Sequence, residues 1–276
     1  MHSDHFNYLF FTIILLAGAL GGFMAGMLGV GGGIIFIPVI QEIIRFDAVE
    51  TDKAFYVLAN SVAIVLVVGI SGTIKQVKLK NTNLKAAIVT GLFACVSSIG
   101  LTYILRYFHF NDPKIFNYIF ASILLFTAAR MWYSYKFKKD NSDELIIPPL
   151  SKFIPAGLLA GIITAITGLG GGVVMVPYFN KVLKLPIKFA TGLSLSVIPI
   201  IALPIMIFYM LGTPGKEVFP GLQTGYIMWT AILPLIITAG IASPFGVKVA
   251  NKLSSKTILI IFMVFITINL IKILIF

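Results

Sequence analysis

Charged residues are scarce in this sequence. Asp, Glu, Lys and Arg make up only 11% of its 276 residues, whereas hydrophobic residues make up 58%. A soluble domain carries about 25% charged residues, so this chain lacks the polar surface that a globule needs in water. With a mean hydropathy of +1.00, the solvent around most of the protein must be lipid.

Cysteine, histidine and buried acidic residues are also nearly missing. The single cysteine, Cys95, lies inside an apolar run, which excludes a disulfide framework and a cysteine metal cluster. The histidines lie near the ends of the chain or of apolar runs, and no Asp or Glu lies deep in such a run. Membrane proton relays use these groups. Without a Ser/His/Asp set or an HExxH motif, we expect no enzyme, no cofactor and no metal site.

The net charge of +11 does not indicate a nucleic-acid partner. Lys and Arg lie in short loops between apolar runs, where lipid head groups and the positive-inside rule account for them. The runs free of charge are 6–41, 54–74, 86–105, 115–129, 153–180, 189–215, 218–247 and 257–271. Since a crossing takes roughly 20 apolar residues, they predict an all-α polytopic protein of a cell membrane, such as the bacterial inner membrane.

The chain contains an internal repeat. Glycines and a proline of the first half recur in the second half, and the separation along the chain is the same for every pair. The pairs join Gly18, Gly22, Gly29, Gly31, Gly32, Gly33 and Pro38 to Gly157, Gly161, Gly168, Gly170, Gly171, Gly172 and Pro177. Further along the match weakens, and Asn60 is aligned with Ser196. The repeat predicts two transmembrane halves, 1–139 and 152–276, joined by a polar linker at 140–151, as is typical of transporters.

The glycine clusters interrupt runs that are too long for one crossing. Residues 6–41 would span roughly 54 Å as a straight helix, whereas the hydrocarbon core is about 30 Å thick. Each Gly costs about 1 kcal/mol relative to Ala in a helix, so we expect each half to begin with a hairpin that turns at its glycines. This topology places 15 Lys and Arg on one side and 6 on the other. The positive-inside rule then makes the richer side cytoplasmic, inverts the second half and leaves both termini outside the cytoplasm.

Two such breaks predict an anion site where the halves meet. A half-helix that starts after the glycines presents open N–H donors and a partial positive charge of about half a unit. The candidate binding residues are Gly29, Gly31, Gly32, Gly33, Gly168, Gly170, Gly171 and Gly172, with Asn60, Thr191 and Ser194 nearby. Pro38 and Pro177 are expected to have structural roles at the half-helices.

A simpler interpretation stays open for each of these features. The glycine clusters would then merely allow a tight turn, and the Ser and Thr hydroxyls would bond their own helix backbone. Asn60 is harder to dismiss, because an amide is costly in lipid and should face protein or a cavity. Gly18, Gly22 and Gly26 have the spacing of a helix-packing stripe, so we expect Gly22→Ala to be milder than valine at a cluster.

The doubled Gly-x-Gly-Gly-Gly element, followed five residues later by Pro38 or Pro177, resembles the TauE/SafE family of sulfite and organosulfonate exporters. This family is also called the 4-toluene sulfonate uptake permease family, and the resemblance covers nearly the whole chain. It implies a secondary transporter for a small sulfur-containing anion, with export the favoured direction and with lipid as the other partner. A homo-oligomer is left open. The alternatives are a passive anion channel or facilitator, and a membrane assembly partner that transports nothing.

Overall fold

The computed structural model describes residues 2–45, 53–107, 145–214 and 221–275, together with Tyr118, Ala121, Ser122, Leu125, Ala129 and Trp132. The first half contains α1 (His2–Leu28), α2 (Gly33–Arg45), α3 (Lys53–Lys78) and α4 (Leu84–Tyr107). The second half contains η1 (Leu150–Phe153), α6 (Ile154–Thr167), α7 (Gly172–Pro177), η2 (Tyr178–Val182), α8 (Ile187–Met210), β1 (Gln223–Thr224), β2 (Ile227–Met228), α9 (Trp229–Lys252) and α10 (Ser255–Ile275). The predicted all-α class is confirmed, with one short antiparallel hairpin between α8 and α9.

Six helices of the described chain are long and apolar enough to cross a membrane, namely α1, α3, α4, α8, α9 and the segment Leu150–Thr167. This confirms a polytopic membrane protein. The apolar run 115–129 and residues 140–144 of the predicted linker lie largely outside the described residues. The boundaries between the two halves therefore stay a prediction.

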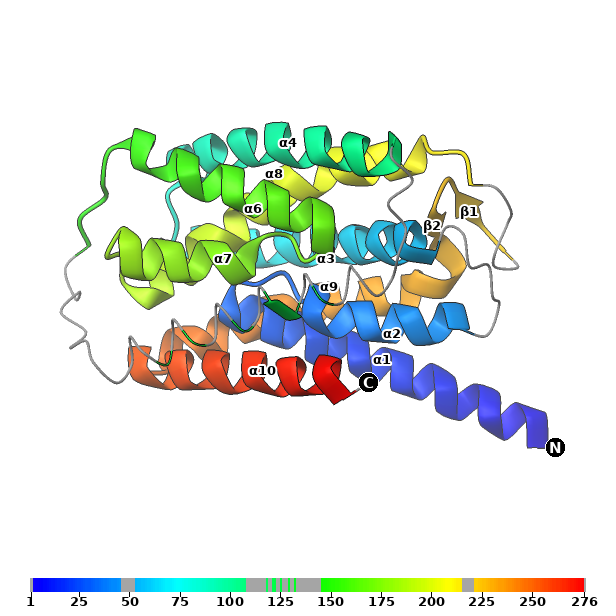
Figure 1. The fold of residues 1–276 in the computed structure, drawn as a ribbon. Coiled ribbons are helices and arrows are strands. Elements are labelled where there is room, and N and C mark those ends of the chain that lie inside the picture. Colours follow the sequence, from blue (N-terminus) through cyan, green and yellow to red (C-terminus); the bar gives the residue numbers. More distant parts are fainter. Residues whose placement is uncertain are drawn as a thin grey trace.

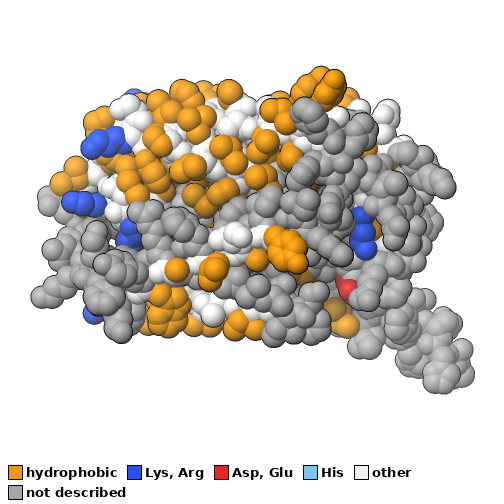
Figure 2. All heavy atoms as spheres, viewed as in Figure 1, with side chains coloured by type: hydrophobic (Ala, Val, Ile, Leu, Met, Phe, Trp, Pro, Cys, Tyr) orange, Lys and Arg blue, Asp and Glu red, His pale blue; other side chains and the backbone are white. Residues whose placement is uncertain are grey.

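The core helices are α3 and α8, which pack against each other between the outer helices (Figure 1). In the most apolar 18-residue stretch of α3, 72% of the residues are buried, against 28% in the equivalent stretch of α4. α4 accordingly turns large apolar side chains such as Val96 and Tyr103 outward. Hydrophobic side chains also cover much of the surface shown in Figure 2, as expected where lipid is the solvent.

The two halves exchange their outer helices. α1 packs along α9, and α6 packs along α4, so the first helix of each half lies on a helix of the other half. Glycines allow this close approach: a Cβ on Gly22 would collide with the backbone of Ala239, and a Cβ on Gly161 with the backbone of Ala94. The predicted packing stripe is therefore present. Gly22→Ala is therefore not expected to be neutral, because the obstacle is main chain and cannot rotate away. That it is milder than valine at a glycine cluster stays a prediction.

Corresponding helices of the two halves run in opposite directions across Figure 1. α1 and α3 run from right to left, whereas α6 and α8 run from left to right. Opposite directions are what an inverted repeat requires. The orientation of the halves in a membrane stays a prediction.

Positive charge gathers at one end of the helix bundle, on the left in Figure 2. This lysine-rich end holds Lys75, Lys78, Lys80, Lys85, Lys152, Lys181, Lys184, Lys188, Lys248, Lys252 and Lys256. All of them belong to the set that the hairpin topology assigns to the cytoplasmic side. Lys53 and Arg45 lie at the opposite end, where α3 begins and α2 ends.

Candidate functional site

Both predicted helix breaks are present at the glycine clusters. α1 ends at Leu28 and α2 begins at Gly33, while α6 ends at Thr167 and α7 begins at Gly172. In between, φ is +70°, +81° and +79° at Gly29, Gly31 and Gly32, and +65°, +76° and +72° at Gly168, Gly170 and Gly171. A side chain in this conformation costs roughly 1–2 kcal/mol per residue. The two breaks thus follow the same path, and each path requires glycine.

The two breaks lie directly against each other. A Cβ added to Gly33 would be 2.8 Å from the Cα of Leu169, and one added to Gly172 would meet the backbone of Val30. Val30 and Leu169, the residues of the two clusters that are not glycine, are both fully buried. The predicted meeting of the glycine clusters at the contact of the two halves is therefore seen in the geometry.

Serine hydroxyls on the core helices donate hydrogen bonds to carbonyl groups at the glycine break of the other half. Ser61 on α3 donates a hydrogen bond to the carbonyl of Gly168 at 3.0 Å, and Ser194 on α8 donates one to the carbonyl of Gly29 at 2.7 Å. Each carbonyl lies just past the last turn of α6 or α1, where a helix leaves acceptors unfilled. Because each serine bonds the glycine break of the other half, Ser61 is the counterpart of Ser194. The predicted alignment of Asn60 with Ser196 is therefore not supported by these contacts.

Two apolar side chains cover both breaks at once. A Cβ on Gly31 would lie 3.1 Å from Val65 Cγ1 and 3.2 Å from Ile198 Cδ1. One on Gly170 would lie 2.8 Å from Val65 Cγ1 and 3.4 Å from Ile198 Cγ2. Val65 and Ile198 have the same separation along the chain as the two serines, and both are fully buried. Methyl groups of Val65 and Ile198 therefore line both breaks on this side.

The start of each half-helix leaves backbone donors open. Among the described residues, no hydrogen bond uses the N–H groups of Gly31, Gly32, Gly33, Ile34, Gly170, Gly171, Gly172 or Val173. The first bonds of the half-helices are made by Ile35 and by Val174, to the carbonyls of Gly32 and Gly171. Open N–H groups at a helix start favour a negatively charged ligand.

The three polar candidates have different surroundings. Ser194 contacts a break directly, as described above. Thr191 lies with its main chain against Gly29, but its hydroxyl donates to the carbonyl of Lys188, 2.9 Å away on the same helix. The Asn60 amide nitrogen donates to the carbonyls of Tyr56 and Tyr226 at 2.8 and 3.0 Å, and its oxygen accepts from the N–H of Met228 at 2.9 Å. Asn60 therefore fixes the β1–β2 hairpin to α3.

Ser61 was missing from the predicted site set. The signal for it was available, since it is a polar residue in the middle of a charge-free run. The proline positions differ between the halves: Pro38 lies inside α2, and Pro177 is the last residue of α7, where the helix continues as the π-helix η2. A π-turn at this point fits a role of proline in shaping the half-helix.

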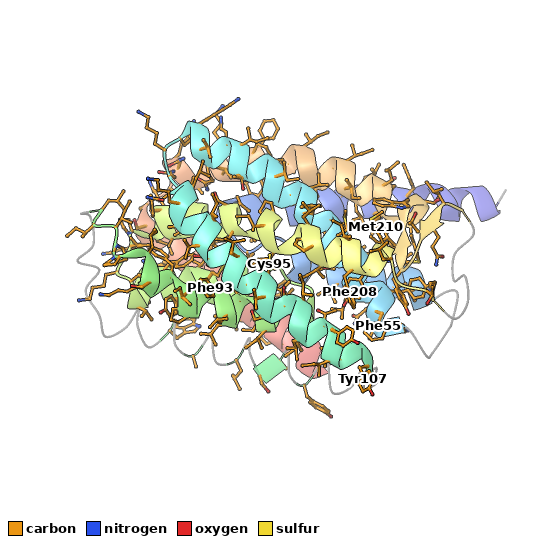
Figure 3. The ribbon with its side chains drawn as sticks, turned by 90° about the horizontal axis from the view of Figure 1, so that it is seen from above. Phe55, Phe93, Cys95, Tyr107, Phe208 and Met210 are labelled. Carbon is orange, nitrogen blue, oxygen red and sulfur yellow. The ribbon has the colours of Figure 1, made fainter. Side chains whose placement is uncertain are left out.

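An aromatic cluster closes the end of the core opposite to the lysines. This aromatic end is formed by Phe55, Tyr56, Tyr209 and Tyr226, with ring centroids 5.2 to 6.4 Å apart. Figure 3 labels Phe55 on α3 and Phe208 and Met210 on α8, all toward this end of the bundle. Gln223 of the hairpin donates to the Tyr56 hydroxyl at 2.8 Å. The hairpin of the second half thus covers the start of α3 of the first half.

No three His, Cys, Asp or Glu side chains come together as a metal site in the described part of the chain. Two halves with exchanged helices and broken helices that meet at their contact define a membrane transporter of the repeat type. The family described as "Sulfite exporter TauE/SafE" matches residues 14–273, and the chain belongs to this family.

Three relatives support the same class. The chain is 28% identical over 273 residues to a probable membrane transporter protein of Haemophilus influenzae, covering 95% of this chain and 98% of that one. It is 26% identical over 248 residues to a probable membrane transporter protein of Methanocaldococcus jannaschii, covering 90% of this chain and 89% of that one. It is 22% identical over 264 residues to the probable membrane transporter protein YunE of Bacillus subtilis, covering 91% and 92%. No solved structure matches the chain.

Proposed function

We propose that this membrane transporter moves a small sulfur-containing anion, such as sulfite or an organosulfonate, as a secondary transporter working in the export direction. The observation that carries the proposal is the meeting of two glycine breaks whose described half-helix starts have open N–H groups. The anion would be held by the N–H groups of both clusters, with Ser194, Thr191 and Asn60 as neighbouring polar residues. The family description, sulfite exporter, supports the sulfur-containing cargo.

The energetics suit a transported ligand. A helix start stabilises an anion by about 0.3–1 kcal/mol when exposed and up to about 2 kcal/mol when partly buried. Two starts and several N–H bonds would support binding in the millimolar to micromolar range, about 4–8 kcal/mol. Such an affinity lets the anion leave as well as enter.

The charge distribution supports the direction and the topology. The lysine-rich end would face the cytoplasm by the positive-inside rule, which places both termini outside and inverts the second half. Lysines at that end would also raise the local concentration of anions inside the cell, on the side from which an exporter loads. The transport step would be a rocking of the halves about their glycine breaks.

Gly31→Ala tests the binding site. The added Cβ would enter the space between Leu169 O, Val65 and Ile198, at 3.1 to 3.2 Å from each, and would also strain a φ of +81°. We expect the flux of radiolabelled sulfite into proteoliposomes to fall about tenfold or more, because backbone approach to the anion is blocked. Gly32→Val and Gly171→Val should abolish flux while the protein still reaches the membrane.

Gly100→Ala is the matched control, because its Cβ would meet no atom within 4 Å. It should transport like the unmodified protein. Full transport by the Gly31, Gly32 and Gly171 variants would refute the site.

A passive facilitator is the second candidate, favoured by the lack of Asp and Glu deep in any apolar run. Secondary transporters that couple to protons commonly use such carboxylates. Sulfite flux that is unchanged when the proton and sodium gradients are collapsed would favour the facilitator over the coupled exporter.

A further inference from the structure

Three residues connect the two halves at the lysine-rich end. Asn81, in the turn between α3 and α4, donates from its side-chain nitrogen to Asn251 Oδ1 at 2.8 Å. Lys188, in the first turn of α8, donates from Nζ to the main-chain oxygen of Asn251 at 2.8 Å. Asn251 in the last turn of α9 thus offers two oxygens to two donors, one donor from each half.

The same place is tightly packed and has an unfilled acceptor. A Cβ on Gly192, one turn beyond Lys188, would collide with the Asn81 carbonyl and lie 3.1 Å from the side-chain amide of Gln76. Gln76 is only 2% exposed, and its Oε1 has no hydrogen-bond donor among the described residues. A buried acceptor without a donor is unfavourable, so this group favours an incoming donor such as water or a hydroxyl.

The charge around Lys188 is uncompensated within the described chain. Its ammonium bonds a neutral carbonyl, and Glu42, the acidic residue whose side chain the structure describes, belongs to α2 at the opposite end (Figure 1). A lysine that bonds the last carbonyls of a helix is a common helix cap. An oxyanion is nevertheless a stronger acceptor than a carbonyl, because its hydrogen bonds to an ammonium are charge-assisted.

We infer that Lys188 and Asn81 form an entry site for a small oxyanion, and that the two oxygens of Asn251 occupy this site until an oxyanion replaces them. The inference rests on the proposed anion transport. Two oxygens of a sulfite or sulfonate group take the places of Asn251 O and Oδ1. Water bound with the anion, or the hydroxyl of a singly protonated oxyanion, satisfies Gln76. Release of Asn251 separates α9 from the α3–α4 turn, which frees the two halves to move apart at this end.

The variants give effects of opposite sign. Lys188→Gln and Asn81→Ala each remove a donor, whereas Asn251→Ala removes the internal Oδ1 that competes with the ligand. We expect the first two to raise the half-saturating concentration of sulfite and methanesulfonate about tenfold, as for loss of a hydrogen bond to a charged group. We expect Asn251→Ala to lower it by about threefold. Lys188→Arg keeps the charge and should restore most of the affinity.

Lys248→Gln is the matched control. Lys248 is exposed on α9 at the same end, so its replacement has the same effect on net charge without touching this cluster. The measurements are binding to the purified full-length protein in detergent by calorimetry, and initial flux in proteoliposomes with the lysine-rich end facing the added anion. Lys248→Gln should change either quantity by less than about twofold.

Each outcome decides between separate claims. Equal shifts for Lys188→Gln and Lys248→Gln would show a surface-potential effect and overturn the entry site. Weaker binding by Asn251→Ala would overturn it as well, because Asn251 would then be part of the site and not its competitor. Wild-type flux with unchanged half-saturation in all four variants refutes the entry site alone. If the unmodified protein neither binds nor moves either anion, the proposed function itself fails.

Discussion

Replacing Asn60 with leucine should release the β1–β2 hairpin from the core. Asn60 is fully buried and makes three hydrogen bonds, two of which reach Tyr226 and Met228 in the other half. Leucine has the same number and branching of side-chain heavy atoms, with methyl groups in place of the amide oxygen and nitrogen. Leu193, which precedes Ser194 as Asn60 precedes Ser61, is the counterpart of Asn60 in α8 and is also fully buried. The substitution therefore removes the polar contacts while keeping the branched shape of the side chain.

The expected loss follows from these three bonds. Hydrogen bonds between membrane helices average about 0.6 kcal/mol, which gives a lower value of about 2 kcal/mol. The upper net value of about 1.5 kcal/mol per bond, applied to all three bonds because the Met228 N–H loses its acceptor in a buried position, gives an upper value of about 4.5 kcal/mol. We expect the free energy of unfolding to fall within this range.

Unfolding in mixed detergent and dodecyl sulfate micelles measures this change. Trp229 follows β2 directly, and its indole donates to Thr224 Oγ1 at 3.1 Å, so its fluorescence reports on the hairpin. Thr90→Val is the control, because the buried Thr90 hydroxyl bonds the Ala86 carbonyl of its own helix, at 2.8 Å. The reasoning would be refuted if the two variants had the same free energy of unfolding to within about 0.5 kcal/mol, the smallest net value of a single hydrogen bond. An unchanged Trp229 spectrum in Asn60→Leu would refute it too.

Three further expectations are open to direct measurement. Gly22→Ala should destabilise the protein by about 1–3 kcal/mol in the same assay, because its Cβ overlaps the main chain of Ala239, whereas Gly100→Ala should be neutral or slightly stabilising. A reporter fused to the C-terminus should be active only outside the cytoplasm, and cytoplasmic activity would reject the inverted topology. Co-expressed fragments 1–141 and 142–276 should restore part of the flux, and failure to assemble would weaken the two-half interpretation.

The glycine breaks could be predicted from the sequence because their cause is local. Residues such as Gly31 and Gly170 adopt conformations that disfavour side chains, and the runs that contain them are too long for one crossing. The lysine-rich end was predictable for a similar reason, since the positive-inside rule acts on short loops. Neither prediction needs a partner from a distant part of the chain.

The register between α3 and α8 could not be predicted in this way. Ser61 and Ser194 are closer together along the chain than Gly29 and Gly168, so the second half has fewer residues between its break and its core helix. Both core helices are rich in Val, Ile, Leu and Ala. Such similar residues do not show where the gap in the alignment of the two halves should be placed. The role of Asn60 could not be predicted either. Its partners lie in the β1–β2 hairpin of the second half, and the first half has no such hairpin between α3 and α4.

The reciprocal serine bonds restrict how the two halves can move. If the halves simply separated, the bonds from Ser61 and Ser194 would both break, and the buried carbonyls of Gly168 and Gly29 would lose these donors. A rotation about the contact of the two breaks leaves both bonds intact.

Such a rotation displaces the ends of the core more than its centre. Asn60 and Gln76 lie toward opposite ends of α3, about 24 Å apart along the helix axis at about 1.5 Å per residue. The aromatic end is held across the halves by ring packing and by the two Asn60 bonds that reach Tyr226 and Met228. At the lysine-rich end, the bond from Asn81 to Asn251 joins the halves, and an anion can replace it. The lysine-rich end is therefore the one that we expect to open first when an anion binds.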